Sequence, residues 1–294
     1  DNWIYTPHWD QGFDESVEVR LPHNPITLPL HYSTPEYYEM VSGYKKTIVL
    51  EEEDLSKRIF LLFQGVAHVS TLYFNGKEIG SHYCGYTSFS HEVTDYIKKG
   101  ENEILVKVDG RESSNIPPFG FVIDYLTYTG IYRDVFLIKK NKTYIEDVFV
   151  TTPTLSSLKA EYTVDGDKDY TILYQLMDGG KVLENGEVQG SILSLSSLSV
   201  SPWSPSSPKL YTLRSTLVAN GKEMDIKEVE FGFRTIETRG KDLYLNGERI
   251  FLQGLNRHQA WPYIGYAASE RMQREDARIL KYELGCNIVR TSHY

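Results

Sequence analysis

The sequence predicts a mainly β chain in which a jelly-roll β-sandwich and an immunoglobulin-like β-sandwich precede a βαβ unit. Three observations lead to this fold class. Short apolar runs separated by turn residues fill the first 140 residues, a second series of such runs follows, and the one convincing helical segment comes after residue 238. We therefore expect domains at 1–140, 141–237 and 238–294.

The first region contains the expected kinds of strand and turn. Residues 58–66 (RIFLLFQGV) are a candidate for a buried strand, whereas residues 102–108 (NEILVKV) alternate apolar and polar side chains. Residues 70–80 predict a hairpin, because Asn75 and Gly76 supply the two positive-φ positions of a type I′ turn. A jelly-roll sandwich and a closed barrel both fit this pattern, and we favour the jelly roll.

The second region has the strand spacing of an immunoglobulin-like sandwich, a fold of about 100 residues. Its apolar runs are IEDVFVTT, LKAEYTV, YTILYQLM and LYTLRSTLVANGKEM. Residues 199–211 (SVSPWSPSSPKLY) are rich in Ser and Pro, so they predict an extended loop and not a ladder strand. We interpret Trp203, in this loop, as a packing anchor of the domain.

After residue 238 the pattern becomes strand, helix, strand. An Asn-Gly hairpin at 243–250 leads into residues 250–258 (IFLQGLNRH), which predict a buried run that ends in polar residues. A helix follows, with Ser269 as its N-cap and Gly285 just past its end. Residues 286–294 are again apolar and then polar. A βαβ unit of this kind belongs to a parallel sheet covered by helices.

Composition excludes several classes of protein. The formal charge is −9 and no Lys/Arg-rich run stands out, which argues against a nucleic-acid partner. No stretch approaches the roughly 20 apolar residues that cross a bilayer, so we expect no membrane partner. The first residues lack the features of a signal peptide; we favour the cytoplasm and leave a removed signal peptide open. Cys84 and Cys286 form no metal or redox motif, and we interpret both as free thiols.

Two histidines occupy matching places in the predicted βαβ unit. His258 follows its first strand and His293 follows its second. In a (β/α)₈ barrel the carboxyl ends of the strands face the active site, so both side chains would line one pocket. The alternative, that each is a surface or core histidine satisfied by the backbone, stays open on position alone.

Several segments resemble glycoside hydrolase family 2, the family of the β-galactosidases and β-glucuronidases. GLNRHQAW, the helix and NIVRTSHY resemble the opening strands of its catalytic barrel. FNGKEIGSHYCGYTSFSHEVTDYIKKGENEILVKV resembles its sugar-binding jelly roll, and DYLTYTGIYRDV the segment that closes that domain. WSPSSPKLYTL and EFGFRTIE resemble its immunoglobulin-like domain and exit strand. The resemblance covers the whole chain and implies that 238–294 are the truncated start of a (β/α)₈ TIM barrel.

The resemblance also assigns roles to five residues. It implies that His258 and His293 hold hydroxyls of the terminal sugar, and that Asp124 contacts a sugar hydroxyl from the jelly roll. In one subgroup the matching aspartate also ligates sodium, so Asp124 is the candidate ligand of a monovalent cation. Arg257 and Arg290 are expected to form ion pairs that support or orient the catalytic carboxylates.

The implied activity is retaining hydrolysis of a terminal β-linked sugar, which needs two carboxylates about 5 Å apart. In the family both are glutamates on later barrel strands, and a barrel takes roughly 250 residues. We therefore expect an N-terminal fragment, without catalytic residues and inactive alone, of a β-galactosidase. A β-glucuronidase, a β-mannosidase and a non-catalytic carbohydrate-binding module are the alternatives. We expect no required cofactor, Na⁺ or Mg²⁺ as candidate ions, a carbohydrate substrate and a homo-oligomeric full-length enzyme.

Overall fold

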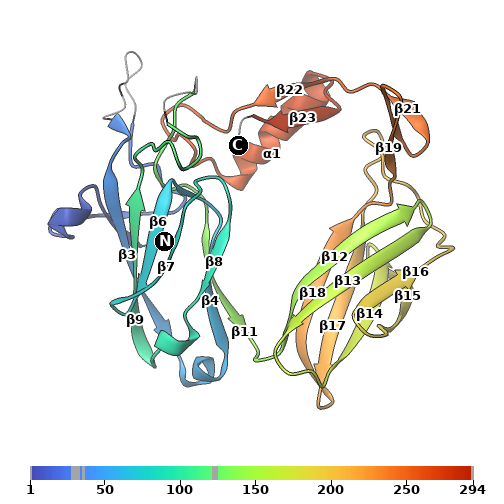
Figure 1. Cartoon of the computed structure of the whole chain (residues 1–294), viewed down its shortest axis with the longest axis horizontal. Coiled ribbons are helices and arrows are strands. Elements are labelled where there is room, and N and C mark those ends of the chain that lie inside the picture. Colours follow the sequence, from blue (N-terminus) through green and yellow to red (C-terminus); the bar gives the residue numbers. More distant parts are fainter. Residues whose placement is uncertain (1, 28–33, 35–36, 121–124, 293–294) are drawn as a thin grey trace. The chain divides into compact units, whose positions relative to one another are not determined.

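The computed structural model describes residues 2–27, 34, 37–120 and 125–292. The chain divides into two compact units (Figure 1). The first unit combines Asp1–Lys139 with Gly254–Tyr294, and the second is Lys140–Gln253. The βαβ segment near the end of the sequence thus belongs to the same unit as the N-terminal β-sandwich.

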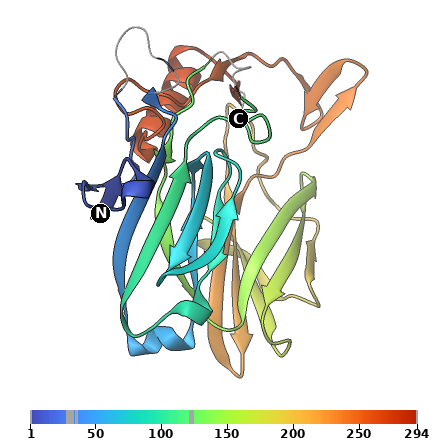
Figure 2. The same cartoon turned by 60° about the vertical axis from the view of Figure 1, so that its left-hand side comes forward.

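The first unit contains a β-sandwich of antiparallel strands, drawn in blue to green in Figure 2. Its largest sheet has the strand order β2-β1-β3-β9-β6-β7, and it is accompanied by the smaller sheets β11-β4-β8 and β10-β5. The strands are β1 Trp3–Thr6, β2 Val17–Val19, β3 Val41–Leu50, β4 Arg58–Phe63, β5 Val66–Ala67, β6 Val69–Phe74, β7 Lys77–His82, β8 Phe89–Glu92, β9 Gly100–Asp109, β10 Gly130–Ile131 and β11 Val135–Lys140. Short 3₁₀ turns lie between them, at Trp9–Gln11, Glu52–Ser56 and Thr94–Tyr96. This arrangement is the jelly roll that the sequence predicts.

Alternation of apolar and polar residues builds the core of this sandwich. Every second residue of β9 points inward, so that Ile104, Val106 and Val108 are at most 2% exposed. Ile59 and Leu61 of β4 are equally buried and belong to the same core. Burying one such side chain contributes about 1.5–3 kcal/mol, so the sandwich is stabilised by its own strands.

The predicted hairpin between β6 and β7 is confirmed. Asn75 and Gly76 have φ values of 49° and 77°, as a type I′ turn requires. The Asn75 side chain also ties the turn to β9, because its Nδ2 donates to Asn102 Oδ1 at 2.8 Å and its Oδ1 accepts from Glu103 N at 2.9 Å.

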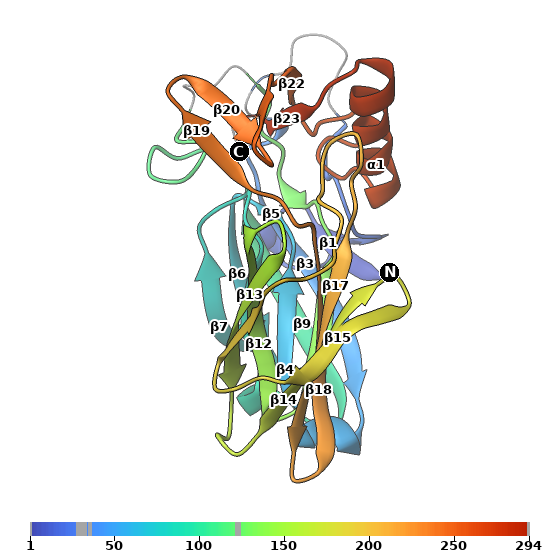
Figure 3. The same ribbon diagram turned by 90° about the vertical axis from the view of Figure 1, so that its right-hand side faces the viewer.

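The second unit is an antiparallel sandwich of the sheets β12-β13-β16 and β15-β14-β17-β18, shown from another side in Figure 3. Its strands are β12 Tyr144–Thr154, β13 Ser157–Asp165, β14 Thr171–Asp178, β15 Lys181–Glu187, β16 Ile192–Leu195, β17 Tyr211–Ala219 and β18 Lys222–Phe231. A small sheet follows, formed by β19 Ile236–Arg239, β20 Asp242–Leu245 and β21 Glu248–Ile250. The turn between β20 and β21 has positive φ at Asn246 and Gly247, which confirms the second Asn-Gly hairpin.

Trp203 packs as an anchor of the second unit. It lies in the Ser/Pro-rich segment, which forms no strand, and its backbone N donates to Phe233 O at 2.8 Å. A β-carbon at Gly232 would lie 2.6 Å from Trp203 Cβ, so the loop approaches the sheet closely at that glycine. The guanidinium of Arg234 lies 5.1 Å from the centre of the indole ring.

The βαβ unit is present in the first unit, and its two strands are parallel. It consists of β22 Gly254–Arg257, α1 Glu270–Arg278 with a π-helical turn at Ile279–Glu283, and β23 Ile288–Thr291. The helix begins after Ser269 as predicted, although the Ser269 side chain makes no capping hydrogen bond. Gly285, with φ 68°, follows its end.

The burial predicted for residues 250–258 is wrong. Phe251 is 80% exposed, Leu252 is 42% exposed, and residues 251–253 form no strand. An apolar run indicates where a strand can form, but only a neighbouring element removes it from water.

Candidate functional site

The carboxyl ends of β22 and β23 lie side by side. In the parallel register Arg257 pairs with Thr291, so His258 and Ser292 each follow directly. Ser292 is completely buried; its N donates to Arg257 O at 3.2 Å, and its hydroxyl lies 3.1 Å from His258 Nε2. The strand pairing therefore holds the exposed imidazole of His258 at the edge where parallel sheets bind their ligands.

A loop of the jelly roll reaches the same histidine. The Tyr125 ring lies 5.1 Å from the His258 ring, centre to centre, at an interplanar angle of 52°. Tyr125 follows Asp124 in the sequence. Asp124 and His293 lie outside the described residues, so the roles predicted for them, including the cation at Asp124, stay predictions. The role predicted for His258 is untested as well.

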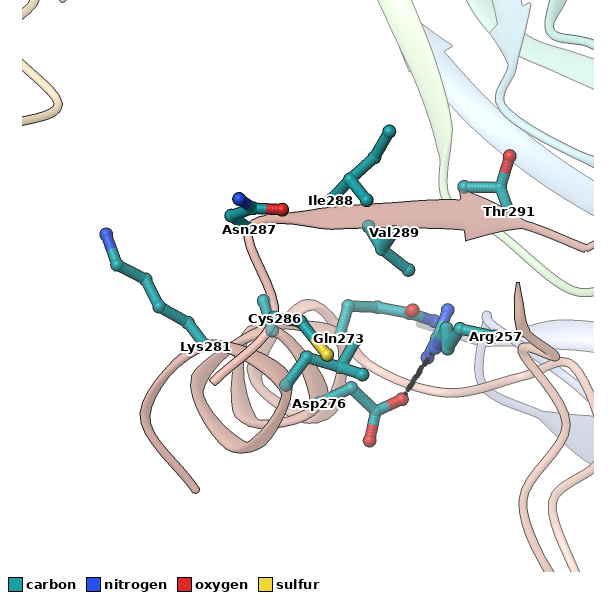
Figure 4. Close-up of a pocket in the computed structure, with 11 residues that line it drawn as sticks. Arg257, Gln273, Asp276, Lys281, Cys286, Asn287, Ile288, Val289 and Thr291 are labelled. Carbon is teal, nitrogen blue, oxygen red and sulfur yellow. Dashed lines mark hydrogen bonds and ion pairs between the residues drawn. The ribbon is translucent and has the colours of Figure 1, made fainter. Parts of the chain in front are cut away.

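Arg257 points to the helix side of its strand. Its Nε donates to Asp276 Oδ2 at 2.8 Å, its Nη2 makes a second contact with the same oxygen, and both side chains are 20% exposed (Figure 4). The pair lines a cavity of about 300 Å³ between α1 and β23, together with Gln273, Ala277, Leu280, Lys281, Cys286, Asn287, Ile288, Val289 and Thr291. Ala277, Leu280, Ile288 and Val289 form the aliphatic part of this lining, which is typical of a helix–sheet interface. Whether Arg257 supports catalytic carboxylates stays a prediction.

Arg290 and Trp261 occupy different surroundings. Arg290 is exposed on β23, opposite Asn256 in the register, and its predicted supporting role is untested. Trp261 is half-buried and lines a second cavity of about 330 Å³, with His258 and Leu280 among its neighbours.

Arg133 is a key residue that the sequence did not identify. Its guanidinium donates to Tyr266 O and to Gln259 Oε1, both in the loop after β22, and lies 4.9 Å from the centre of the Tyr132 ring. Burial lowers the pKa of Arg133 below its ordinary value, and the charge of Arg257 acts in the same direction. These contacts join residues more than 120 positions apart, which no local pattern predicts.

Tyr266 is the centre of this junction. It is 1% exposed, its ring packs against those of Tyr86, Tyr128 and Tyr132, and its hydroxyl donates to Leu126 O at 3.0 Å. The loop between β22 and α1 is therefore attached to the jelly roll from several sides. The abundance of tyrosine in the sequence was the available indication, but it did not identify Tyr266.

Within the described residues, no group of three or more His, Cys, Asp or Glu side chains is placed to hold a metal ion. No helix in the described part of the chain is long and apolar enough to cross a bilayer. The described part of the site at the ends of β22 and β23 thus consists of His258, the buried Ser292, Tyr125 and the loop that follows β22.

The two sandwiches and the βαβ unit define a modular protein in which β domains precede a parallel βαβ unit. Three family models match the chain in order: the sugar-binding domain of glycosyl hydrolases family 2 at 5–141, glycosyl hydrolases family 2 at 143–234, and the TIM barrel domain of that family at 236–294. The chain belongs to glycosyl hydrolase family 2.

Curated relatives agree with this assignment. The chain is 39% identical to a β-galactosidase of Thermoanaerobacter pseudethanolicus, over 100% of the chain and 42% of that protein. It is 34% identical to a β-galactosidase of Thermoanaerobacterium thermosulfurigenes and 30% identical to a β-glucuronidase of Bacteroides fragilis, over 45% and 46% of those proteins. The chain spans less than half the length of these relatives.

Solved structures share the fold. A β-glucuronidase of Bacteroides uniformis matches with a TM-score of 0.84 and 26% identity, over 100% of the chain and 39% of that structure. An FMN-binding β-glucuronidase of Faecalibacterium prausnitzii matches with a TM-score of 0.89 and 24% identity, over 100% of the chain and 48% of that structure. The predicted succession of jelly roll, immunoglobulin-like sandwich and barrel start is confirmed; the domain limits stay predictions.

Proposed function

We propose that the chain is the N-terminal part of a retaining exo-β-glycosidase that releases a terminal β-linked galactose. The observation that carries this proposal is the 39% identity, over the whole chain, to a β-galactosidase. The position of His258 at the carboxyl end of β22 supports it, since ligands of barrel enzymes bind at that face.

In this proposal His258 holds a sugar hydroxyl. The Ser292 hydroxyl next to its Nε2 and the Tyr125 ring beside it restrict the imidazole to one orientation, which is the requirement for recognising a hydroxyl at a fixed position. His293 and Asp124 are proposed to hold further hydroxyls. A carboxylate suits this task because its two oxygens accept several hydrogen bonds in one plane.

The two catalytic glutamates are proposed to lie in the remainder of the barrel, beyond this chain. The acids of the last 55 or so residues support this view, because most are engaged elsewhere. Asp242, Glu270, Glu275, Asp276 and Glu283 all form ion pairs with arginines. A retaining mechanism needs one carboxylic acid that protonates the leaving group and one carboxylate that attacks the anomeric carbon.

A β-glucuronidase is the second candidate, favoured by the 30% identity to the Bacteroides fragilis enzyme. A β-mannosidase and a non-catalytic carbohydrate-binding module are kept as alternatives from the sequence. The full-length enzyme is proposed to be a homo-oligomer that requires no organic cofactor, with Na⁺ or Mg²⁺ as candidate ions; light scattering and activity after chelation test these points.

The decisive experiment compares kcat/KM of the full-length enzyme on the 4-nitrophenyl β-galactoside, β-glucuronide and β-mannoside. We expect the galactoside to be preferred at least tenfold and the 294-residue chain to be inert. Proton NMR of the first product should show the β-anomer. His258→Ala should lower kcat/KM by about 10²-fold or more, because the hydroxyl contact strengthens in the transition state. A full-length enzyme inert on all three sugars would overturn the proposal.

A further inference from the structure

The loop that follows His258 presents one tyrosine to solvent. Trp261 and Gly265 form an antiparallel bridge in which each backbone N donates to the other's O at 3.0 Å. Residues 262–264 are therefore a tight turn. Tyr263 stands at its apex, 71% exposed, with a left-handed backbone at φ 68°.

This turn is held firmly by the jelly roll. A β-carbon at Gly265 would lie 2.4 Å from the Tyr128 ring, so the turn rests directly on that ring. The Asn24 side chain donates to Tyr263 O at 3.3 Å, and the buried Tyr266 fixes the residues that follow. The backbone that carries Tyr263 is thus anchored on both sides, while its ring is left in water.

Folding alone does not account for tyrosine at this position. The left-handed conformation is unfavourable for a bulky side chain, whereas Gly or Asn adopts it readily. The other non-glycine residues with positive φ among those described are Asn and Ser, with the exception of Phe119. Tyr263 makes no ring contact within the described part of the chain. Strained residues of this kind concentrate where a ligand is clamped.

The place of the turn indicates the ligand. Tyr263 comes five residues after His258, in the loop that leaves the carboxyl end of β22, the end at which the proposed terminal sugar binds. In an exo-glycosidase the leaving group extends outward from that sugar. A tyrosine ring presented to solvent from this loop offers a flat apolar face and a polar tip, which suits the apolar face of a pyranose or an aryl group.

We propose that Tyr263 is a specificity-determining residue that stacks on the leaving group of the substrate. The proposal rests on the proposed glycosidase function. It assigns to the turn a role distinct from that of His258: the histidine recognises the terminal sugar, and Tyr263 recognises what is attached to it. Because the backbone of the turn is already held in place, binding loses little backbone conformational entropy at this residue.

The test compares Tyr263→Ala and Tyr263→Phe in the full-length enzyme on the 4-nitrophenyl and methyl β-glycosides of the preferred sugar. Tyr263→Ala should lower kcat/KM for the aryl glycoside by about 5- to 20-fold and change that for the methyl glycoside less than twofold. Tyr263→Phe should retain most of the aryl preference. Tyr282→Ala, which removes a tyrosine of similar exposure (73%) at the far end of the helix, is the matched control and should change neither.

A readout without hydrolysis separates this proposal from the glycosidase itself. Calorimetry of the full-length protein with the 4-nitrophenyl 1-thio-β-glycosides of galactose and glucuronic acid should show the same loss of affinity in Tyr263→Ala. The wild-type enzyme could cleave no glycoside and still bind one of these thioglycosides through Tyr263. In that case the proposed glycosidase function fails, but the proposed stacking of Tyr263 on the group attached to the sugar stands. The stacking role of Tyr263 would be overturned if Tyr263→Ala lost kcat/KM equally on the aryl and methyl glycosides. Unchanged affinity of Tyr263→Ala for the thioglycosides would overturn it as well.

Discussion

The jelly roll and the βαβ unit have similar apolar strands and opposite burial. In β9, Ile104 and Val106 are at most 2% exposed, whereas Ile288 and Val289 of β23 are both 44% exposed. The two regions belong to one compact unit. The strands of the jelly roll bury one another, whereas the pairing of β22 with β23 leaves Ile288 and Val289 partly in water.

This difference shows that strand formation and burial are separate properties, although one hydrophobic pattern is used to predict both. The pattern specifies that a segment forms a strand, and the parallel pairing of β22 with β23 shows that it does so here. Burial depends on neighbouring elements, and it supplies most of the free energy of folding. The jelly roll should therefore respond strongly to core substitutions, and the βαβ unit should respond weakly in this chain.

Two leucines test this difference directly. Leu72→Ala in β6 removes a side chain that is 1% exposed and should lower the free energy of unfolding of the jelly roll by about 3 kcal/mol. Leu255→Ala in β22, where the leucine is 51% exposed, should cost less than about 0.5 kcal/mol. Urea unfolding of the 294-residue chain, followed by hydrogen exchange in peptides of each region, measures both. Equal losses would mean that β22 is as well supported as β6.

A buried histidine makes the stability of the jelly roll depend on pH. His68 is 1% exposed, and neither ring nitrogen has a hydrogen-bond partner among the described residues. Burial lowers its pKa from 6.5 to about 4, against the opposing charges of Glu112 and Asp109. The unfolded chain therefore binds the proton more readily than the folded chain between these two pH values. The stabilisation is complete above pH 6.5 and is lost as the pH falls toward 4.

The expected loss is about 3 kcal/mol, since each pH unit of difference corresponds to about 1.4 kcal/mol. His68→Phe keeps a buried ring without a titrating group. Between pH 7 and pH 4, the free energy of unfolding of the jelly roll should therefore fall by about 3 kcal/mol less in this variant than in the wild type. The control is His8→Phe, which changes an exposed histidine of the same domain. If both variants keep the wild-type pH profile, His68 is not the residue responsible.

The sequence predicted those features that depend on local rules. The alternation in β9, the two Asn-Gly turns, the start of α1 and the parallel βαβ unit all follow from backbone preference and side-chain period. The exposure of Phe251, the bonds of Arg133 to Gln259 and Tyr266, and the contact of Ser292 with His258 could not be predicted in the same way. They depend on which distant segments meet, and the family resemblance supplied residue roles but not those contacts.

The second unit offers a test of packing inside a domain that has a buried core of its own. Gly232→Ala should destabilise it by about 2 kcal/mol, because the new methyl group would lie 2.6 Å from Trp203 Cβ, in a loop held by its own backbone hydrogen bond. Gly180→Ala is the matched control, since nothing lies within 4 Å of its β-carbon position. The two variants are compared by thermal unfolding; similar melting temperatures would mean that the Trp203 loop moves freely.

The smallest expected effects concern two ion pairs of the βαβ unit. The coupling free energy within each pair reports how well that part of the unit is protected from water. Arg257 and Asp276 are each 20% exposed and interact through two nitrogens, whereas Arg274 and Glu270 on α1 are 79% and 76% exposed. A double-mutant cycle should give a coupling of about 1 kcal/mol for the first pair and about 0.3 kcal/mol for the second.

Salt sharpens the same measurement. In 1 M NaCl the coupling of Arg274 with Glu270 should disappear, because water and ions screen exposed charges within about 3 Å, while Arg257 and Asp276 should keep most of theirs. The readout is hydrogen exchange of the α1 amides in each variant. Equal couplings that vanish together in salt would mean that Arg257 and Asp276 are effectively exposed, so that β22 and α1 protect nothing between them. Retained coupling at Arg257 would instead show that even this lightly buried unit shields the carboxyl end of β22, which leads into His258.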